Sequence, residues 1–207
     1  NQDEHLSISG HTIIATELTK RLQNYLSATN LLSVKNSHDR YPSFHGDNLL
    51  YQSQDIDGGY LICNQCLDGT NRQIMVKSYE ELVHPIISQD GRYLAYTEGN
   101  QESSETDVTV RDIVLKTEHR VNGNKQYAAI PMFNHQGTML ALPMWNRNKA
   151  TPANIAIYSL ERNCIIKTIS SKVECWRPIF TNDDKKVLYI QKEKFFKINY
   201  AKICRIA

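Results

Sequence analysis

The stretch HPIISQDGRYLAYTE, residues 84–98, decides the fold because related stretches recur along the chain. Each begins with a proline, passes through a polar turn (HGDN, QDG, HQG or NDD) and ends in a hydrophobic run. The prolines of the four copies are separated by 43, 46 and 47 residues, and they are Pro42, Pro85, Pro131 and Pro178. A period of this size is typical of solenoids and propellers.

Each copy continues with two more apolar runs of period two. The third runs are GYLICNQCL, DVTVRDI, NIAIYSL and KFFKINY, and the fourth are RQIMV, EHRV, IIKTI and a truncated ICRIA. Four short strands in about 45 residues are typical of one propeller blade. The sequence therefore predicts an all-β propeller of four or more four-stranded blades. Because proline cannot donate to a β-ladder, each of the four prolines is predicted to open the innermost strand of its blade.

The first thirty residues have a different character. Apolar residues from Ile14 to Leu26 follow helical spacing, which predicts a helix over about Thr16 to Ala28. We therefore expect an N-terminal helical segment at residues 1–30 and the propeller at residues 31–207. Residues 31–34 are hypothesised to complete the final blade, whose own fourth strand at 203–207 is stunted. The alternative is that further blades follow.

Composition limits the classes of function. The chain has 207 residues and a net charge of +2, too balanced for a nucleic-acid-binding footprint. No run of 18 apolar residues is present, so no segment is expected to span a membrane. The chain begins at Asn1 without a methionine, which leaves a leader or a membrane anchor upstream open.

The cysteines and histidines do not predict a metal site. Cys63 and Cys66 form a CNQC motif, but residues three apart in a strand point to opposite faces, so both are interpreted as small buried hydrophobes. Bridges from Cys164 to Cys175 or Cys204 stay open. The seven histidines show neither HxH nor HExxH spacing. We expect no metal, no cofactor and no catalytic residue.

Candidate binding residues cluster in the loops that join each fourth strand to the next first strand. Such loops converge at one end of a propeller channel, and aromatic residues and arginine dominate interface hot spots. Two further candidates, Trp145 and Arg147, lie in a predicted exposed loop. The candidate rim is His38, Asp39, Arg40, Tyr41, Tyr79, Glu81, His84, Tyr127, Trp176 and Arg177. Alternatively, the residues before the four prolines, Tyr41, His84, Ile130 and Arg177, simply line and fill the channel mouth.

The repeat pattern, proline–x–aromatic, then Asp-Gly, then Leu-Ala-Tyr, resembles the TolB-like, WD-like propeller repeats of bacteria. QDGRYLAYTE followed by DVTVRDI carries the resemblance best, whereas Gln136-Gly137 and Asp183-Asp184 depart from it. The resemblance covers residues 31–207. It implies a non-catalytic binding module of the bacterial envelope, in the periplasm or otherwise outside the cytoplasm.

On this reading, a protein partner or small ligand binds at the channel mouth. The module would act in partner recognition or as the sensory domain of a membrane-anchored transcriptional regulator. The alternative is a propeller that gates a prolyl-oligopeptidase-like hydrolase domain. No G-x-S-x-G nucleophile motif of such a hydrolase occurs in this chain.

Overall fold

The computed structural model describes residues 39–100, 102–103, 105–121, 126–147, 152–192 and 199–206. Within these ranges the chain contains β-strands and no helix, so the all-β prediction is confirmed. The strands form four antiparallel sheets. The helix expected at residues 16–28 and the strand expected at residues 31–34 both lie outside the described residues.

Each sheet collects strands that follow one another in the sequence. The first sheet consists of β1 (Arg40–His45), β2 (Asn48–Gln54), β3 (Tyr60–Cys66) and β4 (Gln73–Ser78). The second consists of β5 (Leu82–Ile87), β6 (Tyr93–Asn100), β7 (Glu105–Asp112) and β8 (Thr117–Arg120). The third consists of β9 (Gln126–Ala128), β10 (Met132–Phe133), β11 (Met139–Asn146), β12 (Asn154–Ser159) and β13 (Cys164–Ile169). The fourth consists of β14 (Cys175–Phe180), β15 (Lys186–Lys192) and β16 (Asn199–Arg205).

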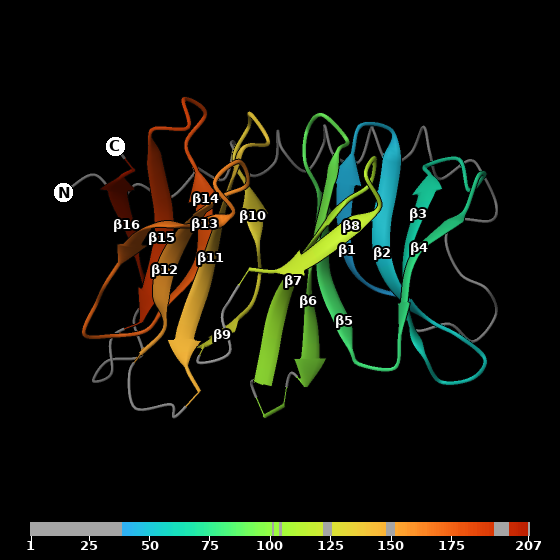
Figure 1. Cartoon of the computed structure of the whole chain (residues 1–207), viewed down its shortest axis with the longest axis horizontal. Helices are drawn as coiled ribbons and strands as arrows, with labels where there is room; N and C mark the ends of the chain where they lie inside the picture. The colour runs from blue at the N-terminus through green and yellow to red at the C-terminus, as the bar shows by residue number, and fades with distance from the viewer. Residues whose placement is uncertain are drawn as a thin grey trace, which may run out of the picture.

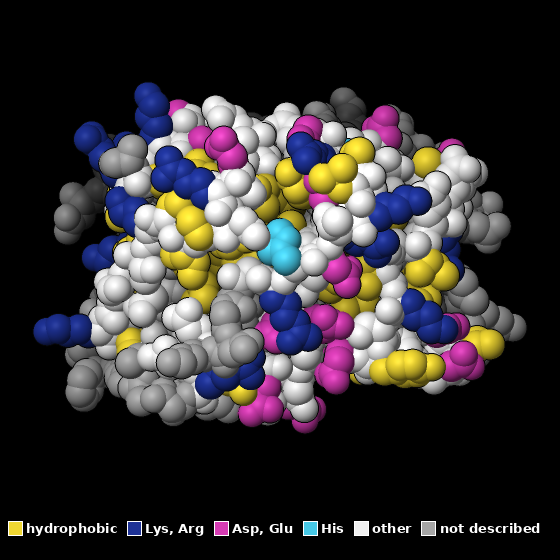
Figure 2. Space-filling view, viewed as in Figure 1, with side chains coloured by type: hydrophobic (Ala, Val, Ile, Leu, Met, Phe, Trp, Pro, Cys, Tyr) yellow, Lys and Arg dark blue, Asp and Glu magenta, His cyan; other side chains and the backbone are white. Residues whose placement is uncertain are grey.

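The four sheets lie side by side in sequence order, with the first and the fourth at opposite ends of the row (Figure 1). Strand β1 contacts β5, β5 contacts β10, and β10 contacts β14, so the first strands of successive sheets are neighbours. On the face seen in Figure 2, basic and acidic side chains are interspersed. The described residues of this face therefore form no extended patch of one charge.

Three apolar cores lie between neighbouring sheets. Leu50 and Ile62 of the first sheet pack with Leu82 and Leu94 of the second, and all four are fully buried. Equivalent clusters join the second sheet to the third and the third to the fourth. Because the middle sheets are covered on both faces, their strands read as almost continuous apolar runs, such as MLALPMW in β11. Full burial of each such side chain contributes about 1.5–3 kcal/mol.

The fourth sheet departs from the predicted pattern. KFFKINY was expected to be its third strand and residues 203–207 its stunted fourth strand. Instead the third strand is Asn199–Arg205, in which Cys204 pairs with Val187 and Ile203 with Leu188. The prediction of a fourth strand at 203–207 is therefore wrong. Both KFFKINY and YAKICR are rich in apolar residues, and in the observed register Cys204 packs against the core between the third and fourth sheets.

The hairpin turns between the first and second strands join neighbouring sheets. Gly137 in the third sheet and Asp184 in the fourth occupy the same turn position with positive φ, 68° and 55°. Asp184 lacks the glycine's freedom, but its carboxylate accepts hydrogen bonds from the backbone N–H groups of His135 and Gln136, at 2.9 and 3.0 Å. It also accepts one from the Asn134 amide at 3.0 Å. Asp184, which stands where the Asp-Gly pattern has glycine, thus links the fourth sheet to the third through these hydrogen bonds.

Candidate functional site

The site begins with a backbone irregularity that occurs four times. The residue before each repeat proline has a left-handed backbone, with φ between 46° and 54°, and these residues are Tyr41, His84, Ile130 and Arg177. This conformation is uncommon outside glycine, and for a β-branched residue such as Ile130 it is an outlier. The strain, about 1–2 kcal/mol for each residue, is held by the surrounding sheet.

Each irregularity interrupts the innermost strand. The pairing of the first two strands shifts between Arg40 and Ser43 in the first sheet and between Val83 and Ile86 in the second. A third shift occurs at β14, and in the third sheet the strand splits into β9 and β10 around residues 129–131. The prediction that the prolines open these strands is wrong for Pro42, Pro85 and Pro178, which lie inside their strands at bulges, where a missing N–H donor is tolerated. Pro131 lies in the break between β9 and β10, directly before Met132, the first residue of β10.

The bulges determine which side chains face inward. In a regular strand successive side chains alternate between faces, so three consecutive side chains do not all point to one surface. Here three consecutive residues of every copy line the same pocket, for example His84-Pro85-Ile86 and Arg177-Pro178-Ile179. The bulge re-aims the side chain before each proline toward the pocket.

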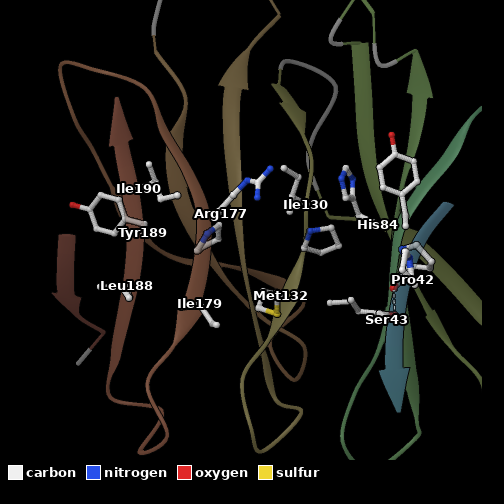
Figure 3. Close-up of a pocket in the computed structure, with 15 residues that line it drawn as sticks. Pro42, Ser43, His84, Ile130, Met132, Arg177, Ile179, Leu188, Tyr189 and Ile190 are labelled. Atoms are coloured by element: carbon white, nitrogen blue, oxygen red, sulfur yellow. Dashed lines mark hydrogen bonds between the residues drawn. The ribbon is translucent and has the colours of Figure 1, made fainter. Parts of the chain in front are cut away.

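The pocket has a volume of about 650 Å³ and is lined by the four bulges together with residues 188–190 of β15. Figure 3 shows Arg177, Ile130 and His84 at one level, and Ile179, Met132 and Ser43 at the next. The walls are mainly proline and aliphatic carbon. A concave, largely apolar pocket with a few polar groups is typical of a binding site, and this volume lies in the range of ligand pockets.

His84 is a half-buried polar group that lines the pocket. Its ring lies 4.6 Å from the Tyr41 ring, centroid to centroid. Burial, helped by the positive charge of Arg177, lowers the pKa of His84 to about 4. His84 is therefore neutral near pH 7. Its Nδ1 atom is buried, and no hydrogen-bond partner for it occurs among the described residues.

Two hydrogen bonds hold the bulges in place. The Ser43 hydroxyl donates to the carbonyl oxygen of Pro85 at 2.6 Å, which joins the first two bulges. The backbone N–H of Ile130 donates to the hydroxyl of Thr97, a fully buried residue of β6, at 3.0 Å. Each bond joins neighbouring sheets, so the geometry of the pocket depends on how the sheets pack.

Three of the predicted rim residues, Tyr41, His84 and Arg177, come together in this pocket, and Ile130 joins them. Arg177 is exposed, whereas the other three are half-buried. The residues after the prolines, including Met132 and Ile179, were not among the predicted candidates. The proline repeat and strand alternation were the available signals, since residues two apart in a strand share a face with the residue before each proline.

A second group of predicted residues forms an aromatic cluster. Trp145 lies in β11 opposite Tyr127 and only 5.4 Å from the Trp176 ring, centroid to centroid. Trp145 is 9% exposed and Tyr127 is 7% exposed, so the expected exposure of Trp145 in a loop is wrong. Arg147 is placed over the Tyr127 ring at 4.3 Å and bonds Asp107 at 3.2 Å. These contacts give the cluster a structural role between β9, β11 and β14.

The remaining candidates are scattered. Arg40 is exposed at the start of β1, and Tyr79 is 78% exposed in the turn before β5. Asp39 and Glu81 are half-buried, and none of these four residues lines the pocket. His38 lies outside the described residues.

The described part of the chain offers no metal-binding group of three or more His, Cys, Asp or Glu side chains. All five cysteines, including Cys63 in the first sheet, are free thiols. Cys63 is fully buried, as expected of a small hydrophobe, whereas Cys66 is half-buried. Neither bridge from Cys164 is formed. Among the described segments there is also no helix long and apolar enough to cross a bilayer.

Comparison with known proteins establishes the fold. No family model matches the chain, and no curated protein matches it. Among solved structures it is similar to the β-propeller domain of the Trilobed protease from Pyrococcus furiosus, with a TM-score of 0.64 and 16% identity over 84% of this chain and 56% of that one. It is also similar to a putative TolB from Agrobacterium tumefaciens, with a TM-score of 0.61 and 14% identity over 78% of this chain and 58% of that one.

A third similar structure is the acylaminoacyl peptidase of Pyrococcus horikoshii, with a TM-score of 0.59 and 12% identity over 84% of this chain and 32% of that one. The chain thus spans little more than half the length of the first two structures. The likenesses show a TolB-like propeller fold, which both binding proteins and peptidases use, and fold alone does not assign the activity.

Proposed function

We propose that this chain is a non-catalytic propeller binding module whose protein partner or small ligand occupies the pocket formed by the four bulges. The observation that carries the proposal is the convergence of four strained residues, one from each sheet, on a single concave surface. Backbone strain that recurs at one surface is typical of functional sites.

The binding test uses methyl-detected NMR on the protein labelled at methionine and isoleucine methyl groups. A panel of small aromatic and aliphatic acids and amides serves as the probe. We expect the compounds that bind to shift the signals of Met132 and Ile179, which line the pocket. The signal of Ile56, which is 99% exposed elsewhere, reports nonspecific binding and is expected to stay unchanged.

A pair of matched variants locates the binding. Met132→Trp fills the pocket and is expected to abolish the shifts, whereas Ile74→Trp adds the same bulk at an exposed position of β4 that does not line the pocket. Equal binding by the two variants, or shifts spread over the surface, would contradict the proposal. The fold of each variant is checked by its thermal unfolding.

The finer role we propose is that of an extracytoplasmic module of the bacterial envelope, for partner recognition or as the sensory domain of a membrane-anchored regulator. The similarity to TolB structures and the repeat pattern support it. The test is the location of the full-length protein in fractionated cells. Recovery with the cytoplasm would contradict this role and leave the binding proposal standing.

The alternative function is that of a propeller gating a hydrolase domain. The likeness to the propellers of an acylaminoacyl peptidase and a prolyl endopeptidase favours it. The full-length protein would then hydrolyse chromogenic peptide substrates, and Met132→Trp would change the rate for long peptides more than for short ones. Absence of hydrolysis by the full-length protein would exclude this alternative.

A further inference from the structure

The pocket carries one positive charge and no negative one. Among the described residues that line it, Arg177 is the ionised side chain, and neither Asp nor Glu occurs. The other basic group, His84, is held neutral by burial. A ligand that enters the pocket at neutral pH therefore meets a single formal charge.

Arg177 is placed to use that charge. It sits at the left-handed bulge position of β14, where Pro178 restricts the backbone that follows. In Figure 3 its guanidinium points across the pocket toward Ile130. Within the described part of the chain it makes no ion pair or hydrogen bond. Its planar set of N–H donors matches the two oxygens of a carboxylate.

The walls around Arg177 are apolar. Ile130, Met132, Ile179 and Leu188 surround it together with the four prolines. Ile179 and Leu188 are 51% and 39% exposed, so this apolar surface is accessible to a ligand. A small, strongly hydrated anion would leave these walls wet, whereas an anion attached to an apolar group would cover them and gain hydrophobic free energy. One cation also matches one negative charge better than a doubly charged phosphate.

We propose that the pocket binds a carboxylate carried by an apolar group, with the carboxylate on the Arg177 guanidinium and the apolar part against Ile130, Met132 and Ile179. The inference rests on the proposed binding function and names the class of ligand. The C-terminus of a peptide that ends in an apolar residue and a free aliphatic or aromatic acid share this chemistry. The experiment below distinguishes these two sources.

Four probes are titrated by calorimetry and methyl-detected NMR. N-acetyl-Phe-Leu with a free C-terminus is compared with its C-terminal amide, and 4-phenylbutyrate is compared with 4-phenylbutyramide. We expect each acid to bind at least about tenfold more tightly than its amide, because the amide loses the charge-assisted bidentate contact with the guanidinium. Tighter binding of the peptide acid points to a peptide C-terminus, and tighter binding of phenylbutyrate points to a free acid.

Variants of Arg177 connect the preference to this side chain. Arg177→Gln is expected to remove the difference between acid and amide, and Arg177→Lys to keep part of it, since lysine keeps the charge but loses the planar fork. Arg162→Gln is the matched control because it removes the same charge from an exposed turn between β12 and β13. It is expected to keep the full preference.

The outcomes separate this inference from the proposed function. Equal binding of acid and amide, with shifts at Met132 and Ile179, overturns the carboxylate assignment and leaves a binding pocket. A preference for acids that survives in Arg177→Gln also overturns it. If no probe from the wider panel shifts these two methyl signals, the pocket itself is rejected.

Discussion

The outward faces of the first and fourth sheets carry the same kind of alternating apolar pattern but differ in burial. On the first sheet, Leu49, Tyr51, Leu61 and Cys63 form a cluster whose members are 0–4% exposed. On the fourth sheet, Ile179, Leu188 and Ile203 are cross-strand neighbours of one another, yet they are 51%, 39% and 58% exposed. The repeat therefore determines the alternation of side chains, and the surroundings of each sheet determine whether they are buried.

The two faces also differ in their polar groups. On the first sheet, Arg72 donates to the Tyr51 hydroxyl at 3.1 Å and to the Cys63 sulfur at 3.1 Å. The Tyr51 hydroxyl in turn donates to the Gln65 side-chain oxygen at 2.8 Å. On the fourth sheet, Lys186 and Arg205 pair across β15 and β16 on the same face as Leu188. Buried polar groups need partners, so the first face has the chemistry of an interior and the fourth that of a surface.

The largest expected effect comes from shortening one leucine on each face. Leu61→Ala is expected to lower the free energy of unfolding by about 2–5 kcal/mol, because it empties a buried site. Leu188→Ala is expected to lower it by about 1 kcal/mol or less, since Leu188 is partly exposed in the folded state. Urea unfolding of the two variants measures both values. Equal losses would show that the fourth face is covered in solution.

The second prediction compares how the two end sheets are fastened to their neighbours. Asp184→Gly keeps the left-handed turn but removes the carboxylate that binds His135 and Gln136. We expect it to lower the free energy of unfolding by about 1–3 kcal/mol, because the amide of the buried Asn134 and the backbone donors of His135 and Gln136 lose their shared acceptor. His45→Ala at the first sheet removes one bond, to the carbonyl of Gln89 at 3.2 Å, and should have a smaller effect.

The pH dependence of the Asp184 contribution has a definite sign. Burial, the largest effect, raises the pKa of this carboxyl, but hydrogen bonds from the backbone and ring of His135 and from the backbone of Gln136 outweigh it and lower the pKa below its usual range. The contribution is therefore fully present above the unfolded pKa and is lost as pH falls through the lower folded pKa. The difference between wild type and Asp184→Gly should shrink in acid, and a constant difference would contradict this assignment.

The sequence predicts most of the strands, because turn residues and period-two alternation recur at nearly constant spacing. It does not predict the bulges. Sterics push a residue before proline toward extended backbone, so nothing local indicates the left-handed conformation of Ile130. That conformation is stabilised by contacts with another sheet, such as the bond from the Ile130 N–H to Thr97.

Two other differences between the predicted and the observed strands also arise from contacts between strands and sheets. Trp145 is followed by Asn, Arg and Lys, which are typical of a loop, yet pairing with Tyr127 extends β11 through it and buries the indole. In the fourth sheet two overlapping runs are both rich in apolar residues, and the observed register places Cys204 against the core shared with the third sheet. Local pattern thus indicates which residues can form strands, whereas contacts between sheets decide where strands extend and which side chains reach the pocket.

The third prediction tests the interior character of the first face. Arg72→Met keeps an apolar stem over the sheet but leaves the Tyr51 hydroxyl and Cys63 without this donor. We expect a loss of about 1 kcal/mol in the free energy of unfolding, the usual net value of a hydrogen bond. Arg72→Lys, which retains a donor, should recover part of it. If Arg72→Met and wild type have the same free energy of unfolding in urea, packing alone, without these hydrogen bonds, stabilises this face.

The smallest effect concerns one repeat position that is half-buried in the second sheet and exposed in the fourth. The His84 ring packs at a tilt against Tyr41 of the first sheet, and burial lowers its pKa to about 4, whereas its counterpart Arg177 is exposed. At a pH between the folded and the unfolded pKa values of His84, this residue is therefore protonated in the unfolded chain and neutral in the folded chain. This contribution is fully present above the unfolded pKa and decreases as pH falls toward the folded value.

Between pH 7 and 6 the loss of free energy of unfolding attributable to His84 should be about 0.5–1 kcal/mol. The free energy of unfolding of His84→Asn is subtracted from that of wild type at each pH, which separates the contribution of His84 from those of the other histidines. The imidazole NMR signals report the pKa of His84 directly. Because burial is the larger cause, Arg177→Gln should keep most of the difference. A wild-type His84 that titrates near 6.5 would mean that Tyr41 does not cover the ring in solution. The second sheet would then resemble the fourth at this position.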